Sequence, residues 1–245
     1  MNISPIAYFH SPLTSKFGIP RQSGLAATLP GYIVFTPDFR REEAVRGIDD
    51  FDFLWLIWGF SANPPPTGGT EGGLTVRPPR LGGNERVGVF ASRSPFRPNR
   101  LGLSCVRLYR VELTPDEGPV IHVLGADLMD GTPIYDIKPY LPYVDSHSEA
   151  RGGFTDEHAW KQLQVDMPAE LRALLSEADA VALEKALALD PRPHYHEDDG
   201  REYGMPFRGM DVIFVVTDGV LRVLRWVTSP SPAGSSTDTC ASRER

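Results

Sequence analysis

The pattern of apolar and polar positions up to about residue 148 is typical of short strands. Runs rich in β-branched and aromatic residues are bounded by Gly, Pro, Asn or Asp. The run after Leu103 alternates apolar and polar side chains, as a half-buried strand does. One short helix fits, at about residues 41–48. The predicted strands cover residues 31–35, 51–60, 86–90, 103–111 and 120–124, and strands at this spacing predict a barrel or a sandwich.

Beyond residue 148 the pattern changes to a mixture of helix and strand. Residues 167–189 predict one helix, which begins near Pro168 and ends before Pro191, with Leu171, Leu174, Leu175 and Ala178 on one face. Residues 212–216 and 221–226 predict a β-hairpin that turns at Asp218-Gly219.

These patterns divide the chain into three parts. We expect a β domain over residues 1–148 and a small α+β domain over residues 149–227. Residues 228–245 are rich in Ser, Pro, Thr and Gly, and this composition predicts a disordered tail.

A polar turn lies between two of the predicted strands. It carries Arg93, Arg97, Asn99 and Arg100 and is interrupted by two prolines. Proline fixes φ and lowers the entropic cost of ordering a loop. Arginine offers a planar fork of donors to a carboxylate, a phosphate or a base edge. The turn is therefore either a binding loop for an anionic or zwitterionic ligand or a surface hairpin with incidental arginines.

Length and composition predict an ordinary globular protein. The chain has 245 residues, of which 41% are hydrophobic and 23% charged, enough for one core and a smaller second unit. Cys105 and Cys240 are poorly placed to pair, which is typical of a reducing compartment. No run approaches the ~20 apolar residues of a membrane span, and no signal peptide is visible. We therefore expect a cytoplasmic protein without a membrane partner.

Charge is distributed unevenly along the chain, whose net charge is -7. Residues 76–110 hold eight arginines and one acid, Glu85, whereas residues 140–200 hold thirteen acids and five basic residues. Affinity for a phosphate backbone depends on the local field and not on the total charge. The arginine-rich segment is therefore compatible with RNA on one face. Alternatively, its charges pair with the acidic segment.

Several kinds of chemistry have little support. The chain has no P-loop, no GxGxxG fingerprint and no CxxC pair. Of its histidines only His194 and His196 are near neighbours, so we expect no metal. Ser94 and Ser104 lack the spacing of a nucleophile elbow.

The segment FASRSPFRPN (90–99), followed by Leu-Gly-Leu-Ser104, resembles the signature of the TsaA-like family, the TrmO-type tRNA methyltransferases. Four further blocks resemble the same family in the same order: KFGIPRQ (16–22), RPPRLGG (77–83), DGTPIYDIKPY (130–140) and DPRP (190–193). The resemblance implies a mainly β fold, in which a TsaA-like barrel binds S-adenosyl-L-methionine between two subunits. It therefore also implies a homodimer.

The resemblance also implies which residues contact the cofactor. Arg21 or Arg93 can pair with its carboxylate, Leu103 can pack against adenine, and backbone groups at Gly131 can read the adenine edge. Asn63 stands where many members have a His-containing pair and precedes an inserted Pro/Gly loop, so this contact departs from the family pattern. The implied contacts are Pro20, Arg21, Gln22, Asn63, Arg93, Leu103, Asp130, Gly131, Thr132 and Pro133.

The reaction that the resemblance implies is methylation of the exocyclic N6 of threonylcarbamoyl-adenosine, next to the anticodon of tRNA. Positioning would supply most of the rate, and an acceptor must take the amine proton. The candidate acceptors are Asp130 and Asp136. A different RNA or small-molecule acceptor, or a module that binds without catalysis, are the alternatives.

The same resemblance suggests contacts to the substrate. Tyr140 can stack on a splayed-out base. Asp136 and Lys138 either shape the target pocket or simply pair on the barrel rim. Arg192 is either a phosphate contact or part of a turn that ends the helix. The predicted substrate contacts are Arg97, Asn99, Lys138, Tyr140 and Arg192.

Overall fold

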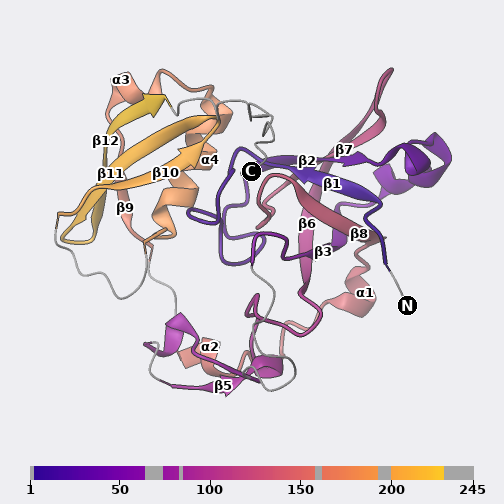
Figure 1. Cartoon of the computed structure of the whole chain (residues 1–245), viewed down its shortest axis with the longest axis horizontal. Coiled ribbons are helices and arrows are strands. Elements are labelled where there is room, and N and C mark those ends of the chain that lie inside the picture. Colours follow the sequence, from indigo (N-terminus) through magenta and orange to yellow (C-terminus); the bar gives the residue numbers. More distant parts are fainter. Residues whose placement is uncertain (1–2, 64–73, 83–84, 158–161, 193–199, 229–245) are drawn as a thin grey trace, which may run out of the picture.

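The computed structural model describes residues 3–63, 74–82, 85–157, 162–192 and 200–228 (Figure 1). A closed barrel is formed by strands paired in the order β1-β2-β7-β6-β3-β8, with β8 returning to β1. Its strands are β1 (Ala7–His10), β2 (Pro30–Phe35), β3 (Phe53–Gly59), β6 (Leu101–Thr114), β7 (Gly118–Leu124) and β8 (Thr132–Pro139). The predicted mainly β fold with a barrel is confirmed, although β1 and β8 were not among the predicted strands.

The barrel interior is filled by alternate residues of its strands, including Phe9, Ile33, Leu56 and Ile121. The register decides which side chains face outward. Trp55 lies opposite Cys105, and Ile57 lies opposite Leu103. These residues therefore share the outer face of β3 and β6, while their neighbours in sequence enter the core.

Two elements predicted in the first part of the chain were wrong. The predicted helix over 41–48 is two 3₁₀ turns, η2 (Glu42–Val45) and η3 (Ile48–Asp50), preceded by η1 (Pro37–Phe39). Gly47, between η2 and η3, has a φ of 82°, which a right-handed helix cannot contain.

The predicted strand over 86–90 is also shorter than expected. Only β5 (Val87–Gly88) pairs, with β4 (Thr75–Val76), and the 3₁₀ turns η5 (Pro79–Leu81) and η6 (Val89–Ala91) flank this two-stranded ribbon. The ribbon lies outside the barrel, so no further strand extends its ladder.

A second unit consists of a four-stranded sheet and helix α4 (Glu177–Ala188) (Figure 1). Its hairpin turns at Asp218 and Gly219, whose φ values of 51° and 75° suit the left-handed turn that such hairpins prefer. The predicted hairpin is thus confirmed. The sheet order is β10-β11-β12-β9, from β9 (Gln164–Asp166), β10 (Tyr203–Phe207), β11 (Met210–Thr217) and β12 (Val220–Thr228), with β9 parallel to β12.

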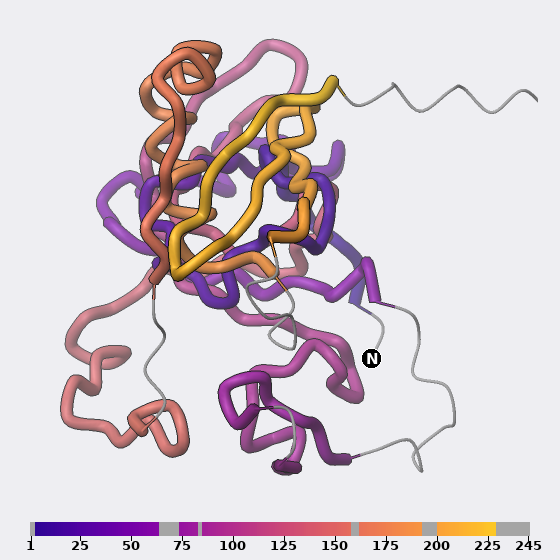
Figure 2. The backbone as a smooth tube through the Cα atoms, turned by 90° about the vertical axis from the view of Figure 1, so that its left-hand side faces the viewer, coloured from indigo at the N-terminus to yellow at the C-terminus, as the bar shows by residue number. Residues whose placement is uncertain are grey.

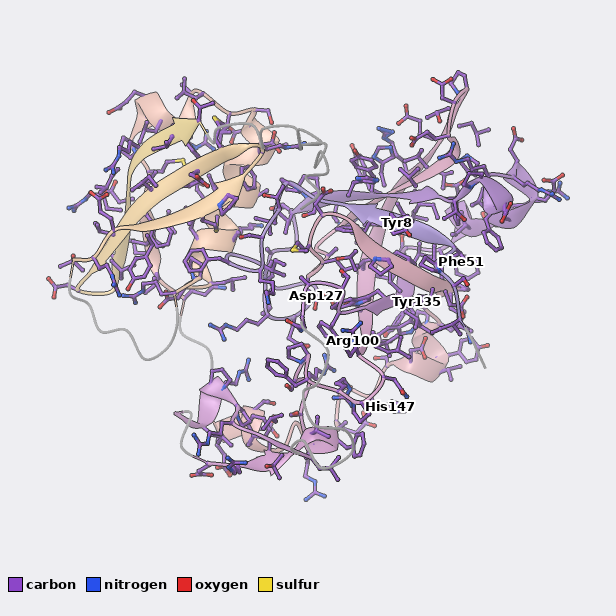
Figure 3. The ribbon with its side chains drawn as sticks, in the orientation of Figure 1. Tyr8, Phe51, Arg100, Asp127, Tyr135 and His147 are labelled. Carbon is purple, nitrogen blue, oxygen red and sulfur yellow. The ribbon has the colours of Figure 1, made fainter. Side chains whose placement is uncertain are left out.

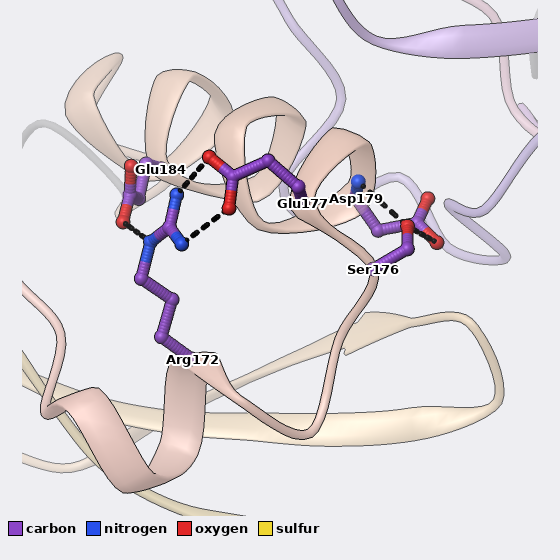
Figure 4. A network of polar contacts seen from close by, with 5 residues as sticks. All are labelled: Arg172, Ser176, Glu177, Asp179 and Glu184. Atoms are coloured by element: carbon purple, nitrogen blue, oxygen red, sulfur yellow. Dashed lines mark hydrogen bonds and ion pairs between the residues drawn. The ribbon is translucent and has the colours of Figure 1, made fainter.

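The single helix predicted over 167–189 was wrong because it is interrupted. A short α3 (Ala169–Arg172) precedes α4, and Ser176 between them accepts a hydrogen bond from the backbone N–H of Asp179 at 3.1 Å. An N-cap serine starts a new helix instead of continuing the old one. Figure 4 shows this cap and Arg172, which joins α3 to Glu177 at 2.6 Å and to Glu184 at 3.1 Å.

The connection between β1 and β2 belongs to both units. Leu13, Ala26 and Leu29 pack into the core of the second unit. Pro12 also accepts a hydrogen bond from the backbone N–H of Arg208 at 2.9 Å. The predicted domain boundary near residue 148 stays a prediction, and the first part of the chain contributes to the second core.

A projecting lobe, which we define as residues 74–82, 85–98 and 154–157, lies below the barrel in both views (Figures 1 and 2). It includes α2 (Phe154–Glu157), and Arg80 donates to the carbonyl of Thr155 at 3.5 Å. No described residue of this lobe belongs to either hydrophobic core. The helix α1 (Pro142–Asp145) lies beside β8 instead.

None of the helices in the described ranges is both long and apolar enough to cross a membrane. The predicted disordered tail lies outside the described residues, apart from Thr228 at the end of β12.

The close approach of β6 to Trp58 predicts a stability effect. A Cβ at Gly102 would overlap the indole of Trp58, which is 7% exposed. We expect Gly102→Ala to lower the free energy of unfolding by about 1–3 kcal/mol, measured by urea denaturation. Gly88→Ala is the control, because its Cβ would meet no atom within 4 Å. Equal stability of the two variants would show that the indole moves aside freely.

Candidate functional site

A cavity of about 680 Å³ opens where β3 ends and β6 begins. Four segments that are distant in sequence meet there: the connection between β1 and β2, the chain after β3, the turn before β6, and the chain after β7. In the view of Figure 3, Asp127 and Arg100 lie between the barrel strands and the projecting lobe.

The cavity brings together about half of the predicted site residues. Residues from the KFGIPRQ block, the polar turn and β6 all reach it. Those that line it are Pro20, Arg21, Gln22, Asn63, Arg93, Arg97, Leu103 and Thr132. Those that do not are Asn99, Asp130, Gly131, Pro133, Asp136, Lys138, Tyr140 and Arg192.

Hydrogen bonds hold the polar wall of the cavity in place. Arg93 Nη1 donates to Gln22 Oε1 at 2.5 Å, which joins two of the predicted cofactor contacts. Lys16 Nζ donates to Asn63 Oδ1 at 3.2 Å, and Arg100 Nη1 donates to the Asn63 carbonyl at 3.1 Å. Two hydrogen bonds therefore hold Asn63 at the cavity edge.

Arg97 lines the cavity but also folds the loop. Its Nη1 donates to the carbonyl oxygens of Ser92 at 2.8 Å and Val89 at 3.2 Å. Its guanidinium also lies 5.9 Å from the ring centroid of Phe90. These contacts stabilise the turn before β6, which carries Arg93 into the cavity.

The DPRP block lies close to the KFGIPRQ block. Partial burial lowers the pKa of Arg21, whereas the nearby charge of Asp190 raises it. Asp190 in turn accepts from Arg192, with Nε to Oδ1 at 2.8 Å and Nη2 to Oδ2 at 2.9 Å. The side chain of Arg192 is only 8% exposed. Arg192 therefore orders this block, and its contact with phosphate stays a prediction.

The apolar wall continues onto the outer face of the barrel. Leu103 is 60% exposed and lines the cavity together with Trp55. The register places Lys138 opposite Trp55 and Asp136 opposite Ile57, so both share this face. The ring of Tyr140 lies 6.0 Å from that of Trp55. The predicted acceptor Asp136 and the predicted substrate contacts Lys138 and Tyr140 thus border the cavity without lining it.

The Asp130-Gly131 turn lies at the neighbouring end of the barrel. Gly131 has a φ of 74°, which explains why glycine is needed there. Asp130 accepts from the Ser11 backbone N–H at 3.1 Å, and its carboxylate lies 3.3 Å from His10 Nδ1. Its carboxylate is thus engaged away from the cavity, and its catalytic role stays a prediction.

Sequence reasoning missed Asp127 and the role of Ser104. Trp58 Nε1 donates to Ser104 Oγ at 2.9 Å, and Ser104 Oγ donates to Asp127 Oδ1 at 2.5 Å. Burial raises the pKa of the Asp127 carboxyl, although hydrogen bonds from Ser104 and the Ser23 backbone and the charge of Arg93 oppose this effect.

The sequence of β6 contains an indication of the contact between Ser104 and Asp127. Ser104 is 1% exposed at an inward position, and its apolar neighbour Leu103 faces outward. In a barrel strand the apolar side chains are expected to face inward and the polar ones outward, so this arrangement is reversed. A buried hydroxyl requires a hydrogen-bond partner. Nothing in the sequence indicates, however, that this partner follows β7.

Within the described ranges, no three His, Cys, Asp or Glu side chains are grouped so that they could hold a metal ion.

The fold and the cavity define the class: a closed β-barrel with a cavity at the strand ends that is lined by arginines and forms without a Rossmann glycine loop. The family model of the tRNA-methyltransferase O N-terminal domain matches residues 8–146, and that of the TrmO C-terminal domain matches residues 160–228. The chain belongs to the tRNA-methyltransferase O family.

Individual relatives agree with this assignment. The chain is 38% identical over 229 residues to the tRNA (adenine(37)-N6)-methyltransferase of Escherichia coli, a match that covers 89% of this chain and 94% of that protein. A Pseudomonas aeruginosa protein named as an S-adenosylmethionine-dependent methyltransferase is 38% identical over 220 residues, or 86% of this chain and 90% of that one. A crystal structure of TrmO from Pseudomonas aeruginosa superposes with a TM-score of 0.73 at 32% identity, covering 93% of this chain and 98% of that one.

The environment of Asp127 predicts how pH affects stability. Because burial raises its pKa in the folded state, the folded protein binds this proton more tightly than the unfolded chain does. The difference in the free energy of unfolding between the wild type and Asp127→Asn should therefore change with pH. The wild type should lose stability relative to the variant as pH rises from the pKa of Asp127 in the unfolded chain to its pKa in the folded protein. We expect this loss of stability in urea denaturation measured from pH 4 to pH 8. A gain with rising pH would show that the hydrogen bonds outweigh burial.

Proposed function

We propose that this protein transfers the methyl group of S-adenosyl-L-methionine to the exocyclic N6 of threonylcarbamoyl-adenosine, next to the anticodon in tRNA. The observation that carries this proposal is the cavity, which gathers residues from separate family blocks, including Gln22, Arg93 and Leu103. The 38% identity to the Escherichia coli tRNA (adenine(37)-N6)-methyltransferase supports the same reaction class.

The residues of the cavity fit the cofactor. A volume of about 680 Å³ is typical of small-molecule sites. Arg93 can bind the carboxylate of the methionine part, and the exposed Leu103 beside Trp55 offers a flat apolar surface to adenine. When bound, S-adenosyl-L-methionine supplies the sulfonium methyl group.

The chain itself has to hold the amine and take up its proton. The lone pair of an exocyclic amine is delocalised into the ring, so positioning at the cavity edge supplies most of the rate. Asp136 lies on the outer face of β8, one strand away from Leu103, with Ile57 between them. It is therefore better placed than Asp130 to accept the amine proton, and Lys138 and Tyr140 follow it along the chain.

The projecting lobe suits an RNA partner. Phe90 and Phe96 are 73% and 66% exposed, and arginines are interleaved with them along the lobe. Exposed aromatic rings stack on unpaired bases, while arginines contact phosphates. The anticodon loop offers unpaired bases of this kind. Asn99, which is exposed at the base of the lobe, would contribute a further polar contact.

We further propose a homodimer that acts in the cytoplasm, where tRNA is modified. The cavity is open to solvent at Leu103, and this exposed outer face continues along β6 to Tyr109, which is 64% exposed. A second subunit on this face would cover the apolar wall of the site.

A different RNA or small-molecule acceptor is the second candidate function, because residues 61–63 depart from the family pattern. The rest of the inserted loop lies outside the described residues.

Methyl transfer to defined tRNA tests the proposed function. Purified protein is incubated with labelled S-adenosyl-L-methionine and tRNA that carries threonylcarbamoyl-adenosine, and nucleosides are identified by mass. We expect a gain of one methyl group on the modified nucleoside alone. The control is the same tRNA without threonylcarbamoylation. Cofactor binding without transfer would favour another acceptor.

The exposed rings of the lobe predict a separate effect on tRNA binding. We expect Phe96→Ala to raise the KM for tRNA about five- to a hundredfold, because base–aromatic stacking contributes about 1–3 kcal/mol per base. The affinity for the cofactor should stay unchanged, since Phe96 does not line the cavity. Tyr143→Ala is the control, because this ring is 85% exposed on α1 and lies outside the lobe. An unchanged KM, or a change in subunit association instead, would contradict the assignment.

A further inference from the structure

The carboxyl group of Asp127 is the one acid among the described residues that line the cavity. The other charged side chains of this wall, Lys16, Arg21, Arg93 and Arg97, are cations. A partly buried acid is tolerated where hydrogen bonds or a cation compensate its charge. Among the described residues of this wall, Asp127 alone can therefore attract a cationic group of a ligand.

The surroundings of Asp127 hold its carboxylate in one orientation. Ser104 Oγ donates to Oδ1 at 2.5 Å, and Trp58 in turn fixes Ser104 at 2.9 Å. The backbone N–H of Ser23 donates to the same carboxyl group. Both Trp58 and Ser104 are almost fully buried, so the acid is supported from the barrel interior and faces the cavity. A carboxylate has about four acceptor positions, which leaves room for a ligand donor.

Arg93 and Asp127 both line the cavity, and the charge of Arg93 lowers the pKa of the Asp127 carboxyl. The cavity thus presents both a cation and an anion to a ligand. The methionine part of S-adenosyl-L-methionine carries the complementary pair, because its α-carbon bears both a carboxylate and an ammonium group. A site for such a zwitterion needs both charges, and the arginines alone supply only one of them.

We propose that Asp127 binds the α-ammonium group of the cofactor, while Arg93 in the same cavity binds the α-carboxylate. This inference rests on the cofactor of the proposed function and not on its acceptor. Asp127 is then a specificity residue: it separates cofactors with an intact amino-acid head from adenosine derivatives that lack the ammonium group.

The test compares two ligands and two proteins by isothermal titration calorimetry. The ligands are S-adenosylhomocysteine and its analogue in which hydrogen replaces the α-ammonium group. We expect the wild type to bind S-adenosylhomocysteine about ten- to a hundredfold more tightly than the analogue. Asp127→Asn should bind both ligands alike, and its affinity for the analogue should match that of the wild type.

Two further variants make the test sharper. Asp166→Asn, an acid of the second unit that pairs with Arg222, should keep the full preference for the ammonium group. Asp127→Ala removes the carboxylate without adding an amide and should lose the preference as Asp127→Asn does, which covers the case that one variant does not fold. A preference that persists in either folded Asp127 variant would overturn the proposal. So would an equal loss of affinity for both ligands, or a wild type that does not bind S-adenosylhomocysteine.

The outcome is separable from that of the proposed function. If the wild type shows the ammonium preference but does not methylate threonylcarbamoyl-adenosine, the acceptor is wrong and the role of Asp127 stands. If methylation occurs and Asp127→Asn keeps the preference, the proposed function stands and this role is wrong.

Discussion

The packing of the β1–β2 connection against the second unit is the interaction on which the site depends. Leu13, Ala26 and Leu29 are each at most 2% exposed within that second core. Burying a leucine side chain contributes roughly 1.5–3 kcal/mol, so this segment is anchored at both ends. Between the anchors lie Arg21 and Gln22, which are thereby held across the cavity. Packing against the second unit thus positions the β1–β2 connection, which forms one wall of the site.

The barrel imposes a second constraint, because its interior must be apolar or fully hydrogen-bonded. Ser104 occupies an inward position, and it is tolerated there because Trp58 donates to it and Asp127 accepts from it. The displaced apolar side chain, Leu103, faces outward and becomes a wall of the cavity. The inward serine and the outward leucine of β6 therefore contribute to both the polar and the apolar surface of the candidate site.

The strands that could be predicted are those whose pattern of apolar and polar residues, and whose residue types, are typical of a strand. Strands β3 and β6 are long and rich in aromatic and β-branched residues, whereas β1 has only four residues and β8 contains Pro133 and Pro139. Proline argues against a strand, and only the closure of the barrel overrides that preference. The family motifs supplied Arg93 and Gln22, but the partnership of Ser104 with Asp127 spans 23 residues and exists only after β6 and β7 have folded.

The ion pairs of the structure also explain part of the uneven distribution of charge along the chain. The arginines of residues 76–110 had two interpretations: a face for RNA, or partners of the acidic segment. In the described part of the chain, the ion pairs of Glu177, Asp179 and Asp190 are made with arginines of the second unit. These three carboxylates are satisfied locally and therefore do not neutralise the arginines of the lobe. A net charge of -7 is then compatible with a basic surface for a polyanion, since these three acids are neutralised within the second unit.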